Sequence, residues 1–162
     1  MLDQTTNLAS LLNDPSLLET RAYIGGQWVD GDNGTFDVTN PARGDVVAQV
    51  ADLSREQVAD AIAKAEKAQK DWAKWTGKER AAVMRKWFDL MMENQHDLGL
   101  ILTAEQGKPL AEAKGETLYA ANLIEFYAGE CQRIYGRTLV RPDGQSARVE
   151  YEPVGPGAAF AP

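Results

Sequence analysis

Two side chains in this sequence are of types that often do nucleophilic or acid–base chemistry, the single Cys131 and the single His96. A reactive thiol needs a neighbouring histidine, a cation or a helix N-terminus to lower its pKa. Cys131 falls near the C-terminal end of a predicted helix, where the helix dipole disfavours a thiolate. We therefore expect Cys131 to be a small, partly buried apolar residue. His96 falls at a break between two predicted helices, and we expect a cap or surface residue.

Acidic residues recur in pairs along the predicted helices, as Glu112 with Glu116 and Glu125 with Glu130. Paired carboxylates act as general acid and base only where they converge on one substrate. Helical spacing favours solvated faces instead, and Lys108 should offset the i,i+4 repulsion between Glu112 and Glu116. One Cys and one His also argue against a metal site built on those ligands. The residues themselves therefore predict no catalytic set and no metal site.

Composition limits the class of protein. The chain has 162 residues, with 17 Lys and Arg against 24 Asp and Glu, and a formal net charge of −7. This acidic balance argues against a nucleic-acid or anionic-membrane surface, and no apolar run approaches the roughly 20 residues of a membrane span. The N-terminus lacks a basic segment followed by an apolar stretch, so we expect no signal peptide. We expect a cytoplasmic protein with no nucleic-acid or membrane partner.

The first third of the chain is predicted to form strands. Residues 22–53 carry short apolar segments separated by turns, which is typical of a small antiparallel β layer. The turns contain Gly25-Gly26, Gly31–Gly34 and Asn40–Asp45. Residues 1–20 have only a weak helical pattern interrupted by Pro15, which suggests a loosely docked arm.

Helices are predicted from residue 54 onward, because the apolar period changes to that of an α-helix. Ser54–Gln57 and Thr76–Glu79 have the form of capping boxes at the start of two helices. Gly107 is expected to end a third helix, and the longest one covers about 109–135. A final hairpin is predicted around Pro142-Asp143-Gly144.

The end of the sequence, Val154–Pro162, is apolar, small and strand-like. A continuous apolar run is typical of a strand buried on both faces. Gly155-Pro156-Gly157 precedes this strand, so it does not have the arrangement of a phosphate-binding loop. Since proteins rarely end on an uncovered buried strand, we expect the front piece of a longer protein. The expected fold class is α+β, with a small antiparallel β layer, several helices and a hairpin.

Several motifs follow one another in order after residue 20: Tyr23–Trp28, Asn40–Gly44, Glu105–Ala113, Phe126–Ala128, Ile134–Gly136 and Glu152–Pro156. Together they resemble the N-terminal part of the NAD(P)-dependent aldehyde dehydrogenases. The Glu105–Ala113 run is most similar to the succinate-semialdehyde dehydrogenase branch. The resemblance implies that the chain is the front part of the α/β aldehyde dehydrogenase fold.

The resemblance also implies a domain organisation. Residues 1–137 would be the N-terminal part of the cofactor-binding domain, residues 138–152 an oligomerisation hairpin that pairs with another subunit of a homo-oligomer, and residues 153–162 the truncated first strand of the dinucleotide-binding sheet. Site residues follow from the same resemblance. Phe160, Ala161 and Pro162 match positions whose backbone borders NAD or NADP, and Tyr119 or Leu123 would face the substrate tunnel.

The implied reaction is oxidation of an aldehyde, succinate semialdehyde, to the acid with NAD or NADP. In the family a thiolate attacks the aldehyde, hydride passes to the nicotinamide, and water activated by Glu releases the acid. That Cys and that Glu come later in the family's sequence and Cys131 does not match the nucleophile, so this chain holds no catalytic residue and should be inactive alone.

Three points stay open at this stage. The alternative function is a freestanding non-catalytic module that pairs with a partner through its hairpin or its last strand. Another aldehyde could replace succinate semialdehyde. The choice between NAD and NADP depends on a segment that reads the ribose 2′ position, which this chain lacks.

Overall fold

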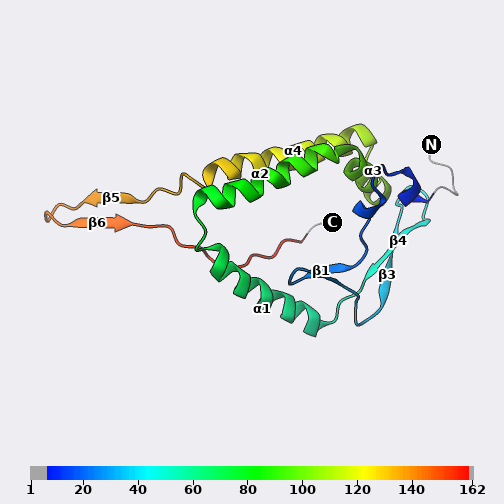
Figure 1. Cartoon of the computed structure of the whole chain (residues 1–162), viewed down its shortest axis with the longest axis horizontal. Helices are drawn as coiled ribbons and strands as arrows, with labels where there is room; N and C mark the ends of the chain where they lie inside the picture. The colour runs from blue at the N-terminus through cyan, green and yellow to red at the C-terminus, as the bar shows by residue number, and fades with distance from the viewer. Residues whose placement is uncertain (1–6, 161–162) are drawn as a thin grey trace.

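The computed structural model describes residues 7–160. Its main body consists of three helices, α2 (Gly77–Glu93), α3 (Gln95–Gln106) and α4 (Leu110–Glu130), and α4 packs along both α2 and α3. Helix α1 (Arg55–Trp72) lies apart from this group (Figure 1). The order of helices and strands along the chain agrees with the α+β fold class predicted from the sequence.

The strands in the described part of the chain form three separate two-stranded antiparallel sheets. These pair β1 (Ala22–Ile24) with β2 (Gln27–Val29), β3 (Thr35–Thr39) with β4 (Val46–Ala51), and β5 (Arg137–Val140) with β6 (Ser146–Val149). The predicted β layer is thus present as two hairpins rather than one continuous sheet. Strands β1 and β2 have only three residues each, so they offer few backbone groups for pairing with a further strand. The hydrogen bond from Ala51 N of β4 to Thr20 O (2.9 Å) connects β4 to the segment before β1 and not to β1 itself.

Both predicted capping boxes are confirmed. Ser54 Oγ accepts a hydrogen bond from Gln57 N (3.2 Å), and Gln57 Oε1 accepts one from Ser54 N (3.0 Å). Gln57 also reaches the turn between β2 and β3, because its Oε1 accepts from Asp32 N (2.9 Å) and its Nε2 donates to Asp30 O (2.9 Å). The start of α1 is therefore fixed to the β hairpins. Thr76 and Glu79 cap α2 in the same way.

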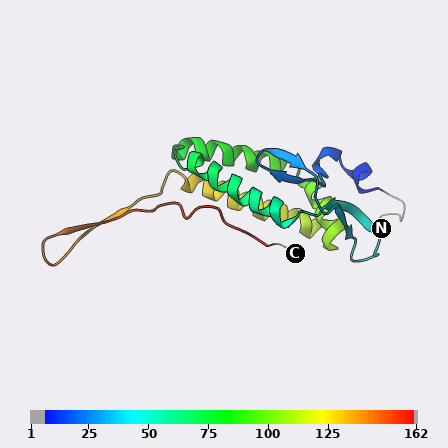
Figure 2. The ribbon, with the colours of Figure 1, turned by 90° about the horizontal axis from the view of Figure 1, so that it is seen from below.

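The long helix is shorter than predicted, since α4 ends at Glu130 rather than near residue 135. Beyond it the backbone hydrogen bonds tighten to i→i−3 spacing, from Gln132 N to Gly129 O (3.5 Å) and from Arg133 N to Glu130 O (2.9 Å). The Glu130–Arg133 ion pair (2.8 Å) bridges the same turn. The chain then leaves the helical body and enters the β5–β6 hairpin, which extends away from it (Figure 2).

The N-terminal arm is docked more firmly than its sequence suggests. Leu8 and Leu12 are buried and form a cluster with Ala104 of α3. The carboxylate of Asp97, which is 2% exposed, accepts hydrogen bonds from Asn13 Nδ2 (2.9 Å) and from Asp14 N (2.8 Å). The Asp14 N–H contributes most to holding the pKa of Asp97 below its ordinary value.

We predict that Asp97→Asn releases the arm, because an amide nitrogen would replace one of two acceptor oxygens that each face a donor. Hydrogen exchange of residues 8–18 should become faster in this variant. The control is Asp89→Asn, which changes an exposed carboxylate on α2 and should leave the exchange unchanged.

The same contact should depend on pH. Because the pKa of Asp97 is lowered, its ionised carboxylate stabilises the fold above the unfolded-state pKa of about 3.9, and this stabilisation is lost as the pH falls through the lower folded-state pKa. Protection of the arm should therefore fall on acidification below about pH 4 in the natural chain and not in the variant. Equal exchange in both proteins at neutral pH would contradict the anchoring role.

Candidate functional site

The residues predicted to border a substrate lie on the outer side of α4. Tyr119 and Leu123 are one helical turn apart and are 66% and 43% exposed, and Phe126 on the same side is 59% exposed. The opposite side of α4 carries the buried Ala113, Ala121 and Ala128. A helix with apolar residues on both sides is typical of one that is covered on both sides. Here only the side that faces α2 and α3 is covered.

The residues predicted to border the cofactor lie at the end of the chain. Phe160 is 98% exposed, and Ala161 and Pro162 are outside the described residues. Residues 150–160 form neither helix nor strand, and we call this segment the tail. Gly155 and Gly157 have open space around them, so the described residues do not by themselves form a cradle for a dinucleotide. Up to residue 160 the tail pairs with no described strand, and the predicted first strand of the dinucleotide-binding sheet, residues 153–162, stays a prediction.

Cys131 and His96 are where the sequence analysis expects them. Cys131 is partly buried directly after α4, and its Sγ lies 3.5 Å from Met84 Sδ, so it packs as an apolar residue. His96 is exposed in the first turn of α3. Within residues 7–160, no group of three or more His, Cys, Asp or Glu side chains could hold a metal ion.

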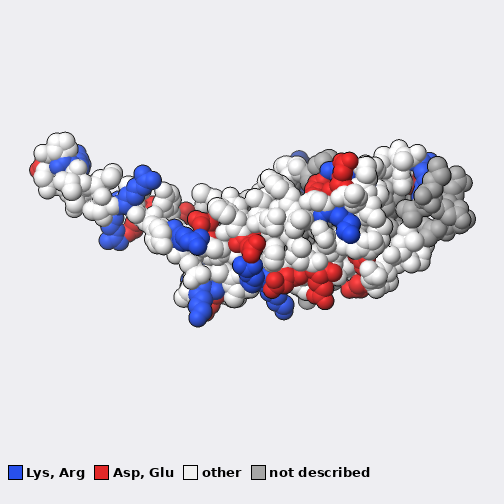
Figure 3. Space-filling view, turned by 90° about the horizontal axis from the view of Figure 1, so that it is seen from above, with Lys and Arg blue, Asp and Glu red and all other residues white. Residues whose placement is uncertain are grey.

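The acidic pairs on α4 are solvated and ion-paired, as predicted. Lys108 forms an ion pair with Glu116, and Arg85 of α2 forms one with Glu125 (2.6 Å). Figure 3 shows acidic and basic side chains interspersed on the face in view, without a continuous basic patch there. These carboxylates therefore lie on the surface of the helical body and do not converge on a common point.

Two of the motifs that carry the family resemblance lie against each other, which the sequence does not reveal. Gly107, with a φ of 80°, ends α3, and a Cβ at this position would lie 2.9 Å from Pro41 Cγ. Pro41 belongs to a turn organised by the buried Asn40, whose Oδ1 accepts from Ala42 N (2.9 Å). The α3–α4 joint and the β3–β4 turn are thus packed together, although residues 41 and 107 are far apart in the sequence.

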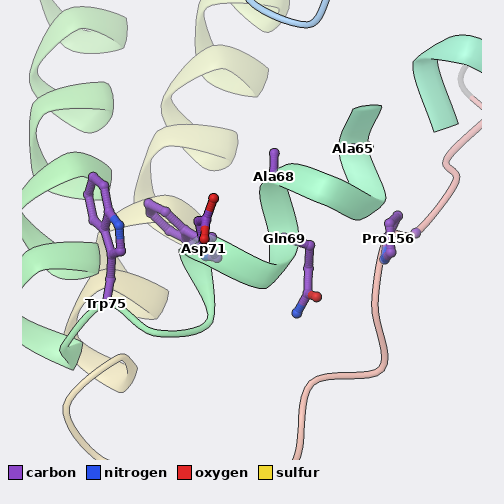
Figure 4. Close-up of a pocket in the computed structure, with 8 residues that line it drawn as sticks. Ala65, Ala68, Gln69, Asp71, Trp75 and Pro156 are labelled. Atoms are coloured by element: carbon purple, nitrogen blue, oxygen red, sulfur yellow. The ribbon is translucent and has the colours of Figure 1, made fainter. Parts of the chain in front are cut away.

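A groove of about 700 Å³ lies beside the C-terminal part of α1 (Figure 4). Its lining includes Ala65, Ala68, Trp72 and Trp75 from α1 and the segment after it, and Pro156 and Gly157 from the tail. The two indole rings lie 5.2 Å apart. The spacing of these tryptophans in the sequence does not mark a site, and the return of the tail past α1 brings this lining together.

Comparison with known proteins identifies the family. Residues 28–162 match the aldehyde dehydrogenase family. The chain is 48% identical over 154 residues to the glutarate-semialdehyde dehydrogenase of Pseudomonas putida, and 47% identical over 155 residues to the NADP(+) succinate-semialdehyde dehydrogenase of Escherichia coli. Each match covers 93% of this chain and 32% of the relative.

Solved structures agree. The succinate-semialdehyde dehydrogenase of Burkholderia pseudomallei has a TM-score of 0.78 and 51% identity, over 82% of this chain and 28% of that one. The betaine aldehyde dehydrogenase of Staphylococcus aureus, solved in complex with NAD+, has a TM-score of 0.76 and 28% identity, over 84% of this chain and 27% of that one.

This chain belongs to the aldehyde dehydrogenase family and corresponds to the front part of its structures. It spans about a third of the length of the curated relatives that it matches. Its relatives include succinate- and glutarate-semialdehyde dehydrogenases, which confirms the branch indicated by the Glu105–Ala113 motif. No helix within residues 7–160 is long and apolar enough to cross a membrane.

We predict that Gly107→Ala destabilises the chain and that Gly115→Ala stabilises it. At Gly107 the added methyl group meets Pro41 in a left-handed backbone conformation, which should cost about 1 kcal/mol or more. At Gly115, within α4, the methyl group meets nothing within 4 Å, and the higher helix propensity of Ala should add about 0.5–1 kcal/mol. Urea unfolding of the two variants measures both changes. A Gly107→Ala variant that is as stable as the natural chain would show that the α3–α4 joint does not depend on this glycine.

Proposed function

We propose that this chain supplies the front part of an enzyme that oxidises succinate semialdehyde to the acid with NAD or NADP, and that the chain alone is inactive. The observation that carries the proposal is the similarity to semialdehyde dehydrogenases, which covers 93% of the chain. The inactivity follows from the chemistry of the described residues. Cys131, the single thiol of the chain, is partly buried directly after α4 and packs against Met84 as an apolar residue.

The proposal assigns a role to each part. Residues 1–137 form the front of the cofactor-binding domain, 138–152 the oligomerisation hairpin, and 153–162 the first strand of the dinucleotide-binding sheet. The backbone of Phe160, Ala161 and Pro162 borders the cofactor. Tyr119 and Leu123 border the aldehyde, which is supported by their exposure on an apolar side of α4.

A chimera tests this proposal. In it, the part of the Escherichia coli relative that follows the matched region is joined to residue 162, so that the missing chemistry is supplied. We expect reduction of NADP+ by succinate semialdehyde with the chimera and none with the chain alone. Tyr119→Ala and Leu123→Ala should raise the KM for the aldehyde in the chimera, by about 10-fold for loss of one apolar contact.

Phe36→Ala is the matched control, because Phe36 is an exposed aromatic residue on β3, outside the proposed site. It should leave the KM unchanged. A chimera that folds but does not reduce NADP+ would argue against the proposed enzyme and favour the non-catalytic interaction module. A KM equally sensitive to all three substitutions would remove Tyr119 and Leu123 from the substrate site.

We further propose that the β5–β6 hairpin pairs with another subunit of a homo-oligomer. The hairpin extends from the helical body (Figure 1), and within residues 7–160 its two strands pair only with each other. Leu139 and Val140 of β5 are 50% and 86% exposed. Unpaired strand edges that carry apolar residues are suited to pairing with a further strand.

Replacement of Leu139 and Val140 together by Lys should lower the subunit number of the chimera, because the charges oppose burial of the hairpin. Size-exclusion chromatography with light scattering measures the change. The control replaces Ala59 and Ala63, two exposed alanines on α1, by Lys. An unchanged subunit number in the hairpin variant would contradict the pairing.

A further inference from the structure

The turn between β2 and β3, residues 31–34, carries a chemically reactive dipeptide. Asn33 is followed by Gly34, and it is the only one of the six asparagines in the sequence that precedes a glycine. An asparagine deamidates when the backbone nitrogen of the next residue attacks its side-chain carbonyl carbon, and a side chain on that next residue hinders the attack. Gly34 has no side chain, a Cβ there would meet nothing within 4 Å, and both residues are exposed to water. By sequence and exposure, Asn33 is the asparagine most open to deamidation.

Hydrogen bonds of the closed turn oppose this reaction. Gly34 N donates to Gly31 O (3.0 Å), so the attacking nitrogen is engaged. Asn33 N donates to Asp52 O (3.1 Å), and Asn33 Nδ2 donates to Leu53 O (3.3 Å). The nitrogen and the carbonyl carbon must leave these contacts before they can react, so that deamidation proceeds from an opened turn.

The side chain of Gln57 controls how easily the turn opens. It accepts a hydrogen bond from Asp32 N and donates one to Asp30 O, at 2.9 Å each, and both contacts join the residues before Asn33 to the first turn of α1. Ser54 Oγ adds a hydrogen bond to Asp32 Oδ2 (3.1 Å). These hydrogen bonds are exposed, and exposed hydrogen bonds open locally without unfolding of the whole chain. Opening of the turn therefore depends on a few contacts that single substitutions can remove.

We propose that Asn33 is a site of spontaneous deamidation, that Gln57 sets its rate, and that the reaction weakens the connection between the β hairpins and α1. In the reaction, Gly34 N loses its proton to hydroxide and bonds to Asn33 Cγ, the Cγ–Nδ2 bond breaks, and ammonia leaves with a proton from water. Water then opens the cyclic imide at either carbonyl group and leaves Asp or isoaspartate at position 33. No oxidant or reductant is needed, and the inference does not depend on the proposed function.

The product differs from Asn33 at the place where the turn meets α1. The new carboxylate cannot donate to Leu53 O as Nδ2 does, and it adds a negative charge next to Asp32. Isoaspartate also places an additional carbon atom in the backbone. Asn33 N and Gly34 O, which both bond to the backbone of Asp52, then no longer match it. We therefore expect the turn and the start of α1 to open more often after deamidation.

Peptide mass spectrometry of the chain during incubation at mildly alkaline pH measures the reaction, since Asp and isoaspartate differ from Asn in mass and from each other in retention. We expect conversion at Asn33 ahead of the other five asparagines, and faster conversion in urea, where the turn is unfolded. Gln57→Ala should accelerate the reaction of the folded chain about tenfold, the factor expected from the loss of one or two hydrogen bonds. Gln57→Glu keeps the acceptor for the helix cap but loses the donor to Asp30 O, so it should accelerate the reaction by a smaller factor.

Gln69→Ala is the matched control for the rate. It makes the same substitution in the same helix, three turns away from Gln57, and should leave the rate unchanged. Hydrogen exchange of residues 30–34 and 54–58 measures the effect on the structure, and it should be faster in Asn33→Asp than in the natural chain. Asn122→Asp makes the same change at an exposed position on α4 and should leave this exchange unchanged.

Each part of the inference has a result that would overturn it. Equal conversion of Asn33 and the other asparagines would contradict the modification site. Equal rates in the folded chain and in urea, or in Gln57→Ala and Gln69→Ala, would contradict control by the contacts of the turn. Equal exchange in Asn33→Asp and the natural chain would contradict the weakened connection to α1.

Discussion

Close approach of helices to α4 is the contact on which the rest of the structure depends. Ala113 and Ala121 are completely buried on the side of α4 that faces its neighbours. Gly99 of α3 lies where a Cβ would come within 2.7 Å of Lys114 Cγ, and Gly77 lies where a Cβ would collide with the carbonyl oxygen of Cys131. Small residues on both sides thus let the helices approach one another closely. The N-terminal arm then docks on α3.

Much of this architecture could be predicted from local signals. Both capping boxes, the left-handed end of α3 at Gly107 and the strand pairs depend on residues only a few positions apart, so their patterns are visible in the sequence. The anchoring of the arm by Asp97 could not be predicted, because its partners lie more than 80 residues away. The early end of α4 was missed for a related reason. The apolar positions continue to Ile134, while the backbone already turns where α4 meets the start of α2.

The candidate site was predictable only through the family resemblance. Tyr119 and Leu123 follow the same helical period as core residues, so that periodicity cannot tell a substrate-facing side from a packed one. The structure separates the two sides, because Ala113, Ala121 and Ala128 of α4 are buried and its aromatic residues are not. Cys131 is the opposite case. Its position on the apolar face at the end of a helix was sufficient to predict a small, partly buried apolar residue, and its burial and its contact with Met84 agree.

The first capping box shows how a tertiary contact can select between two residues that serve a helix start equally well. Either Glu or Gln can accept the hydrogen bond from the cap backbone, and Glu79 does so at α2. At α1, however, the same side chain must also donate to the carbonyl oxygen of Asp30. A carboxylate has no proton to donate, and its negative charge would be repelled by the partial negative charge of that carbonyl oxygen. The amide of Gln57 therefore sets the direction in which α1 leaves the β hairpins, so that the identity of one residue encodes the angle between two parts of the molecule.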